Sequence, residues 1–531
     1  MSSTIMESKE GVAHVDVHHS TVLKNQDLMS DAFDGENREH EMGVWQAVKA
    51  YPWAAFWAFI MCFTIVMESF DMFLNGNFVA QKAFQNHFGV EVAGTEGKTI
   101  ETKWQSSLFQ AGQCGAFVGV FLAGPITNRI GYRWTAILGL ILMNATIFVS
   151  FFADSLELLV VGQALEGVPW GLFIANSPAY ASEIVPLALR GACTATLQMS
   201  WSIGGIIVAA ATLAYNSRSD EWAWRGPLAL QWIFPTPLLV LIFFAPESPW
   251  WLSRKGRKEE ALRSVKRLGG NNSVEHAQQS LAMIERTVEI EAQMGGTPTL
   301  LDLFKGTDLR RTVIVCLMYA SQNFAGNLIA NQATFFFEQA GISPDRAFDL
   351  NLINSCLQFI ANGLSWPLTA WFDRRTIYLW GTAANIAMLF LLGIVASIHQ
   401  NSATNYTQAV LGIIISFVYA GTLGPISYTI ISETSSVRLR ALSTGVGRAA
   451  YYVAEIPMIY LASRLLNPTG WNLAGKCGYV WGSTAVVCWV MAFFFLPELK
   501  HRTYRESDIL FNRKVPARKF KSTIVDLKDN E

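Results

Sequence analysis

Ser182-Glu183-Ile-Val-Pro-Leu-Ala-Leu-Arg190 has a second version in the same chain, Ser432-Glu433-Thr-Ser-Ser-Val-Arg-Leu-Arg440, 250 residues further on. Both copies follow a long apolar run and keep their Glu and Arg at the same spacing. Two other motifs recur at a similar separation: Pro246-Glu247-Ser248 with Pro497-Glu498-Leu499, and Asn128-Arg129-Ile-Gly131-Tyr-Arg133 with Phe372-Asp373-Arg374-Arg375. Motifs that recur at one period indicate an internal duplication. The sequence therefore predicts two homologous halves.

The composition is that of a membrane protein. Of the 531 residues, 51% are hydrophobic and only 15% are charged, whereas a soluble protein carries about 25% charged residues. The 34 Phe and 18 Trp are typical of a chain whose rings meet lipid and its interfaces. The net charge of -1 gives no indication of nucleic-acid binding.

Apolar runs of the length needed to cross a bilayer recur along the whole chain. We expect an all-α membrane protein of twelve transmembrane helices in two six-helix pseudo-repeats, related by an axis along the membrane normal, which is the major facilitator fold. The expected spans are 52–73, 106–127, 134–153, 156–180, 192–214, 227–245, 312–337, 350–372, 377–398, 409–432, 442–465 and 478–496. The expected domains are a disordered N-terminal tail (1–50), a first bundle (51–245), a helical loop (246–311), a second bundle (312–496) and a C-terminal tail (497–531).

Lys and Arg gather on one side of these spans, which the positive-inside rule assigns to the cytoplasm. Both termini and the loop 246–311 are then cytoplasmic. The polar segment 1–50 has no apolar stretch after a basic start, so we expect no cleaved signal peptide. Asn405, in the sequon Asn405-Tyr-Thr407, falls in an outer loop and is a candidate glycosylation site.

The repeated charged motifs lie at the cytoplasmic helix ends, where they could form a gate. We expect acids such as Glu183 and Glu433 to pair with arginines across helix ends and to separate when the halves rock. The alternative is that these charges only set the topology and snorkel to the interface. The duplicated Glu-to-Arg spacing favours the gate, whose candidate residues are Arg129, Arg133, Glu183, Arg190, Glu247, Arg374, Arg375, Glu433, Arg440 and Glu498.

The chain resembles the sugar porters of the major facilitator superfamily and, more narrowly, the fungal α-glucoside (maltose-type) permeases. The broader resemblance rests on Asn128–Arg133, Glu183 with Arg190, Pro246–Pro249 and Gly424-Pro425. The narrower one rests on Gly162–Gly171, Ala229–Ile233, Phe244–Leu252, Ser432–Arg440 and the tail Val515–Ser522. The resemblance implies import of maltose and related α-glucosides together with protons, across the plasma membrane.

Charged residues inside the expected spans are few, and they are costly there unless they serve a function. Glu68 and Asp71 lie three residues apart and are close enough to feel each other's charge. Arg448 is their natural cation, and the resemblance implies that these three residues couple transport to protons. A fixed ion pair that never titrates is the alternative. Where the permeases have a Gly-Glu pair in the second helix, this chain has Cys114-Gly115-Ala116, which leaves uncoupled transport open.

A sugar site needs amides and hydroxyls for the ring oxygens and aromatic faces for the C–H surfaces. The eighth span carries amides on one helical face, including Asn354 and Gln358. Hydrogen bonding between helices is the alternative role of such amides. The candidate substrate-binding residues are Gln110, Gln113, Gln198, Gln322, Asn323, Asn327, Asn354, Gln358, Trp170, Tyr428 and Tyr452.

Other classes of protein find little support in the sequence. The seven cysteines are odd in number and nearly all lie in apolar runs, so we expect no disulfide framework. They form no CxxC pair, so we expect no structural metal site, and we expect no cofactor. We find no nucleophile–base pair, so an enzyme is not expected. The leading interpretation is a monomeric sugar:proton importer working by alternating access in the lipid bilayer. A facilitator or exporter of another sugar or glycosylated metabolite, and a non-transporting sugar sensor, remain as alternatives.

Overall fold

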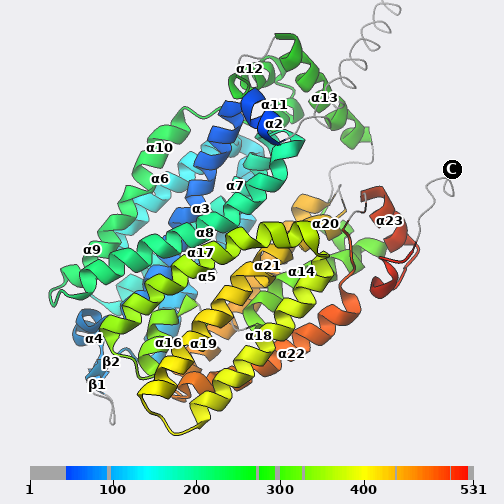
Figure 1. Ribbon diagram of the computed structural model, residues 1–531. Helices are drawn as coiled ribbons and strands as arrows, with labels where there is room; N and C mark the ends of the chain where they lie inside the picture. Colours follow the sequence, from blue (N-terminus) through cyan, green and yellow to red (C-terminus); the bar gives the residue numbers. More distant parts are fainter. Residues whose placement is uncertain are drawn as a thin grey trace, which may run out of the picture.

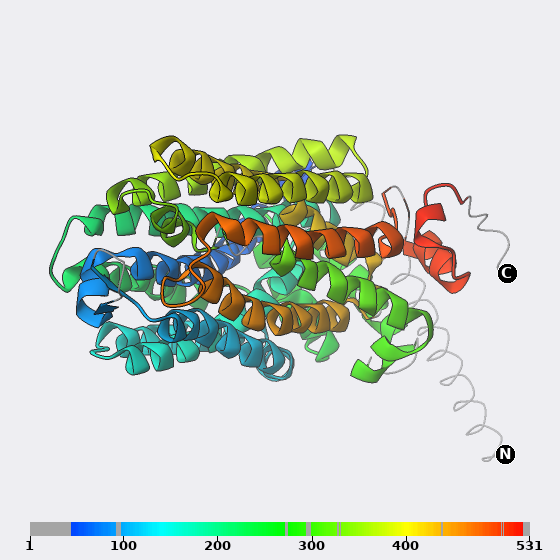
Figure 2. The same cartoon turned by 90° about the horizontal axis from the view of Figure 1, so that it is seen from below.

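The chain folds into long helices that pack side by side with their axes roughly aligned (Figures 1 and 2). The computed structural model describes residues 44–91, 97–270, 274–293, 299–325, 329, 331–436, 439–500, 502 and 504–523. Many large apolar side chains on the outer surface are exposed, such as Phe121, Phe148 and Val487. Such a surface suits contact with lipid tails rather than with water.

Six helical segments form the N-terminal half: α3 (Pro52–Ala80), α5 (Thr102–Ile130), α6 (Tyr132–Phe151), α7 (Leu156–Ile184), α8 (Leu187–Asn216), and a broken sixth segment. The sixth consists of α9 (Trp222–Leu230), η1 (Gln231–Ile233) and α10 (Pro235–Phe243). Pro235 begins α10, where a residue without an N–H group is tolerated because the first turn needs no donor.

The C-terminal half repeats this plan with two broken segments. Its elements are α14 (Gly306–Phe324) with α16 (Ala333–Gln339), α17 (Pro344–Trp371), α18 (Arg374–Ser397), α19 (Ser402–Gly421) with α20 (Leu423–Thr434), α21 (Arg440–Leu466) and α22 (Cys477–Phe495). The expected twelve-helix architecture in two six-helix pseudo-repeats is confirmed.

Within the described residues, nine helical segments are long and apolar enough to cross a membrane by length and composition. The helices α14, α17 and α21 are not among these nine. They carry many of the polar side chains that line the interior, such as Gln322, Asn354 and Arg448. Their lower hydropathy therefore marks an inward-facing role.

The short elements lie at the two ends of the helices (Figure 1). One end carries α4 (Lys82–Phe88) and the paired strands β1 (Val90–Glu91) and β2 (Lys98–Thr99), with η3 (Ala474–Lys476) following α21. The other end carries α11 (Pro249–Arg254), α12 (Lys258–Leu268), α13 (Val274–Gln293), η2 (Leu300–Phe304), α23 (Tyr504–Asn512) and η4 (Ala517–Lys519). We call these the outer and the inner end, following the topology predicted from the sequence.

The tail expected to be disordered over 1–50 is helical at its end, where α2 spans Val44–Ala50. That part of the expectation is wrong, because α2 packs against α3 and α8 and buries Ala47 completely. Residues 1–43 of the tail lie outside the described residues.

Candidate functional site

A central cavity with about 960 Å³ of empty space lies between the two halves. The N-terminal half contributes to it from α3 and α8, and the C-terminal half from α14, α16, α17, α19, α20 and α21. Of the residues predicted from the sequence, the cavity is lined by Gln198, Gln322, Asn354, Gln358, Tyr428 and Arg448.

The polar face of α17 lines this cavity along its length. Asn351 donates to Asn77 Oδ1 at 3.0 Å, and Asn362 donates to Ser202 Oγ at 2.5 Å, so both amides bond across helices. Between them, Asn354 is buried and its Oδ1 has no hydrogen-bond partner among the described residues. A buried acceptor without a partner is costly. The Asn354 Oδ1 can therefore accept a hydrogen bond from a group in the cavity.

Other predicted amides bond between helices instead of facing the cavity. Gln110 of α5 donates to the carbonyl oxygen of Ile456 at 3.0 Å, and Asn323 of α14 donates to that of Tyr451 at 3.2 Å. Both contacts fix α21 against a neighbouring helix, which is the alternative role weighed for such amides. Asn327 lies outside the described residues.

Gln113 and Trp170 line a second, smaller pocket, with about 360 Å³ of empty space. Met72 and Asn331 line both this pocket and the central cavity, so the two spaces adjoin. Tyr452 is buried, with its ring 5.1 Å from the Arg448 guanidinium carbon. The aromatic candidates therefore lie in different places: Trp170 at the smaller pocket, Tyr428 at the central cavity and Tyr452 beside Arg448. They do not form a single surface for stacking against a sugar ring.

Several cavity residues were not predicted from the sequence. Asn77 lines the cavity and accepts hydrogen bonds from Thr334 at 2.7 Å and from Asn351. The predicted first span ended at residue 73, whereas α3 continues to Ala80. A longer helix, drawn through the polar Asn75-Gly-Asn77, could have revealed it. Tyr419 was also missed, and its hydroxyl donates to Gln322 Oε1 at 3.2 Å.

Arg448 joins the cavity to a group of buried acids. Its Nη1 donates to the Tyr428 hydroxyl at 3.3 Å, and its guanidinium carbon lies 4.4 Å from the centre of the Tyr451 ring. Glu68 and Glu455 both interact electrostatically with Arg448. Among the ion pairs described in the structure, none joins Arg448 to either acid, and the arginine Nε has no hydrogen-bond partner. Arg448, Glu68 and Glu455 are therefore buried near one another, with no ion pair described between the arginine and either acid.

Asp71 faces a different direction from Glu68. Its Oδ2 accepts a hydrogen bond of 3.2 Å from Trp170 Nε1, and its strongest electrostatic neighbour is Glu166. Residues three apart on an α-helix point about 60° away from each other. We expected both acids to face Arg448. In this structure Arg448 acts electrostatically on Glu68, whereas Asp71 bonds to Trp170 of α7.

The charged motifs at the inner end form two matching clusters, one in each half. In the N-terminal half, Glu183 accepts from Arg254 at 2.8 Å and from the Tyr132 hydroxyl at 3.1 Å, and Glu247 accepts from the Tyr132 backbone N–H at 3.0 Å. The prediction named Arg129, Arg133, Arg374 and Arg375 as the partners of Glu183 and Glu433. Arg129 is exposed, and Glu183 pairs with Arg254, which was not among the predicted partners. Arg133 instead donates its backbone N–H to Glu247 Oε2 at 3.2 Å.

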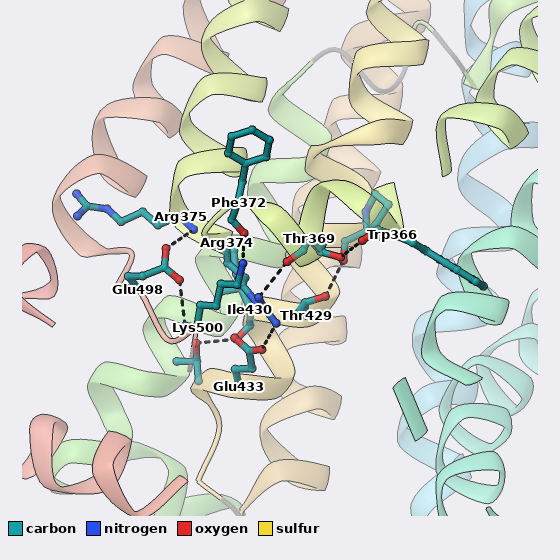
Figure 3. Close-up of polar contacts among 12 residues, drawn as sticks. Trp366, Thr369, Phe372, Arg374, Arg375, Thr429, Ile430, Glu433, Glu498 and Lys500 are labelled. Carbon is teal, nitrogen blue, oxygen red and sulfur yellow. Dashed lines mark hydrogen bonds and ion pairs between the residues drawn. The ribbon is translucent and has the colours of Figure 1, made fainter. Parts of the chain in front are cut away.

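Figure 3 shows the matching cluster of the C-terminal half, in which Arg374 pairs with Glu433 at 3.2 Å. Glu498 accepts from the backbone N–H groups of Arg375 at 2.9 Å and of Lys500 at 3.0 Å. Burial raises the pKa of Glu433 above its usual range, although Arg374 opposes the shift. Each ion pair described at the inner end joins two residues of the same half, and none of those described joins the two halves. The side chains of Arg190 and Arg440 lie outside the described residues.

The two halves are joined by hydrogen bonds at the outer end. Asn467 Nδ2 donates to the carbonyl oxygen of Ile100 at 2.8 Å and to Gln105 Oε1 at 2.5 Å, and the Thr102 N–H donates to Thr469 Oγ1 at 2.9 Å. The interface follows α5 against α21 and α8 against α17. These contacts hold the two halves together at the outer end.

Comparisons with known proteins agree with this geometry. Residues 57–511 match the family described as "Sugar (and other) transporter". The chain is 36% identical over 508 residues to a maltose permease of Saccharomyces cerevisiae, covering 94% of this chain and 82% of the permease. It is 35% identical over 519 residues to a general alpha-glucoside permease of the same yeast, covering 96% of this chain and 84% of that permease.

Among solved structures, the inward-open xylose transporter XylE of E. coli superposes with a TM-score of 0.69 at 18% identity, covering 86% of this chain and 99% of XylE. Its partially occluded inward-open form gives a TM-score of 0.67, covering 84% of this chain and 99% of XylE. These likenesses identify the fold. Together with the match over most of the length, they show that this chain belongs to the sugar (and other) transporter family and is a multi-pass membrane protein with the major facilitator fold.

Proposed function

We propose that this protein imports an α-glucoside such as maltose together with protons, by alternating access, in the plasma membrane. The observation that carries the proposal is Arg448, which lines the central cavity and also interacts with the buried acids Glu68 and Glu455. One cation is then shared between the sugar space and the proton-binding groups. The names of the yeast relatives, a maltose permease and an alpha-glucoside permease, support the choice of substrate.

The cavity offers the sugar both hydrogen-bonding and apolar surfaces. Asn354, Gln358 and Gln198 supply amides for the hydroxyl groups, and Trp201 and Tyr428 supply ring faces for the C–H surface. A site that bonds hydroxyl groups supplies buried polar atoms that are not already paired within the protein. Asn354 Oδ1 is such an atom.

Coupling follows from competition for Arg448. While the cation faces Glu68, it stabilises the ionised carboxylate, and moving the cation away favours protonation. A sugar that bonds to Arg448 or Tyr428 draws the guanidinium toward the cavity, since the two side chains are joined at 3.3 Å. Sugar binding therefore promotes proton binding at Glu68.

The inner clusters serve as the cytoplasmic gate in this proposal. The moving units are the two bundles 51–245 and 312–496, with both termini in the cytoplasm and a single chain as the transporting unit. Glu183 and Glu433, each now paired within its own half, would exchange partners when the inner end closes. The glycosylation proposed at Asn405 concerns a half-buried side chain near the start of α19.

Uptake of radiolabelled maltose into a yeast strain that lacks its own maltose and glucoside permeases tests the proposal. We expect saturable uptake that rises as the external pH falls, with alkalinisation of an unbuffered medium when sugar is added. A panel of α-glucosides and monosaccharides, each checked against surface expression, defines the substrate. Absence of uptake for every sugar despite surface expression contradicts the proposal.

Uncoupled transport is the second candidate, favoured by Ala116 on α5. This residue is buried against α7, and the structure places no acid at its position. A facilitator would move the sugar down its gradient without changing the pH of the medium. Uptake without alkalinisation therefore distinguishes it from the symporter.

A further inference from the structure

A second group of buried polar residues lies inside the N-terminal half. Asp71 and Asn75 are one turn apart on α3, and Gln163, Glu166 and Trp170 follow one another along one face of α7. All five side chains are buried. Two carboxyl groups inside one helix bundle are expensive and require a physical reason.

The contacts between these helices fix the register of the group. Asn75 Nδ2 donates to Gln163 Oε1 at 2.7 Å, and Trp170 Nε1 donates to Asp71 Oδ2 at 3.2 Å. Because Glu166 lies between Gln163 and Trp170 on α7, these two bonds hold it opposite Asp71. The two carboxyl groups are electrostatic neighbours as a result.

The hydrogen-bond donors are divided unequally between the two acids. Glu166 accepts from Ser150 Oγ at one oxygen and from Gln163 Nε2 at 3.0 Å at the other. Among the described residues, Asp71 accepts a hydrogen bond from Trp170 at Oδ2, and its Oδ1 has no partner. Donors directed at both oxygens stabilise the ionised form. The arrangement thus favours a negative charge on Glu166 and a proton on Asp71 Oδ1.

No cation faces this pair among the described residues. The groups that act on it are Glu68 from the preceding turn of α3, Ser150 from α6, the neighbouring side chains of α7, and Gln231 from η1. Gln231 is completely buried beside both acids. Two adjacent carboxylates without a counter-charge in dry surroundings cannot both stay ionised. At least one proton must remain on the pair.

We propose that Asp71 and Glu166 form a proton-binding site that holds one exchangeable proton between them, separate from the group around Arg448. This inference deepens the proposed proton-coupled transport and rests on it for its role in transport. The link to the substrate is Trp170, which bonds to Asp71 and also lines the pocket that adjoins the cavity. A ligand that engages the indole N–H removes the donor to Asp71 Oδ2 and thereby strengthens proton binding at the pair.

Infrared spectroscopy of the purified full-length protein in lipid vesicles tests the shared proton directly. At neutral pH the wild-type protein should show the C=O stretch of a protonated carboxylic acid. The double variant Asp71→Asn/Glu166→Gln should lose one acid's share of that band, whereas the control Glu157→Gln, on the exposed first turn of α7, should keep it. An unchanged band in the double variant overturns the proposal.

Transport by single variants tests the role of the pair. Glu166→Gln should abolish the pH dependence of sugar uptake while sugar exchange in preloaded vesicles continues, and Glu166→Asp should restore part of the pH dependence. A wild-type pH profile in Glu166→Gln overturns this role. If the wild-type protein moves no sugar, the proposed function fails, but the infrared result still decides whether the pair holds a proton.

Discussion

At the scale of single residues, the buried charges divide into two groups with different surroundings. Glu68 and Glu455 share Arg448, whereas Asp71 and Glu166 face one another with neutral donors around them. One turn of α3 separates the acids that belong to different groups. The direction of each side chain, more than its depth in the membrane, determines its electrostatic partner.

The double variant Glu68→Gln/Asp71→Asn should lose uphill accumulation of sugar and keep downhill exchange. A membrane potential of 100 mV acting on one co-transported proton can support about 50-fold accumulation, and loss of coupling reduces this ratio to about one. The steady-state ratio of internal to external labelled sugar measures uphill accumulation, and a counterflow assay measures downhill exchange. Accumulation that persists in the double variant, as in the control Glu157→Gln, contradicts the assigned role.

Gly131→Ala should destabilise the inner cluster of the N-terminal half. Gly131 has a φ of +92°, and a Cβ atom there would lie 2.4 Å from Glu247 Oε2. Backbone strain of this kind costs about 1–3 kcal/mol, in addition to the displacement of Glu247. Thermal unfolding of the purified protein in detergent should show a lower midpoint. Gly124→Ala, where a Cβ meets nothing within 4 Å, is the matched control and should not lower it.

At the scale of elements, the contact between α5 and α7 positions Trp170 and Glu166. The helices approach through glycines on both sides, including Gly119 and Gly171. Such small residues allow two backbones in a membrane to pack closely. The same contact brings Trp170 over Gly112, where a Cβ would lie 2.4 Å from the indole ring.

Gly119→Ala should force α5 and α7 apart, because the added Cβ would lie 2.1 Å from the carbonyl oxygen of Val168. An overpacked core typically loses about 1–3 kcal/mol of stability. We expect less folded protein at the cell surface and a lower midpoint of thermal unfolding. Gly363→Ala on α17, with nothing within 4 Å of the added Cβ, should leave both unchanged, and equal behaviour of the two variants would refute the packing argument.

At the scale of the whole molecule, the hydrogen bonds between the halves lie at the outer end and around the central cavity. Asn467 and Thr469 reach residues of the first half, while the inner ion pairs stay within their own halves. Breaking the outer hydrogen bonds should favour the conformation that is open to the outside, because these bonds hold the two halves together at that end.

Asn467→Ala/Thr469→Val should increase access to the cavity from outside. Each lost hydrogen bond is worth about 1 kcal/mol and therefore shifts the conformational equilibrium about fivefold. The measurement is labelling of the cavity variant Asn331→Cys by a membrane-impermeant thiol reagent, with the exposed Cys114 and Cys356 replaced by Ala. Ser107→Ala removes a hydroxyl bonded within α5 at 2.7 Å and should not change the labelling rate. No increase in the double variant would contradict the outer closure.

The sequence by itself determined the fold and the cavity helices of this protein. Hydrophobic length and the repeat around Glu183 and Glu433 specify twelve spans in two halves, because each span must satisfy its own backbone within the bilayer. Helical spacing placed Asn354 and Gln358 on one face, since that face depends only on positions within one element. The same pattern within single elements predicted that α17 and α21 carry both polar and apolar side chains.

The tertiary structure alone decided which side chains meet. Whether Asn323 faces a ligand or Tyr451, whether Glu183 pairs with Arg133 or Arg254, and whether Asp71 faces Arg448 or Glu166 depend on helix rotation and on close approaches such as that of α5 to α7. These contacts join residues far apart in the chain, and the rotation of each helix about its own axis decides which of them form. Periodicity within one helix carries no information about the rotation of its neighbours, so the sequence could predict the candidates but not their partners.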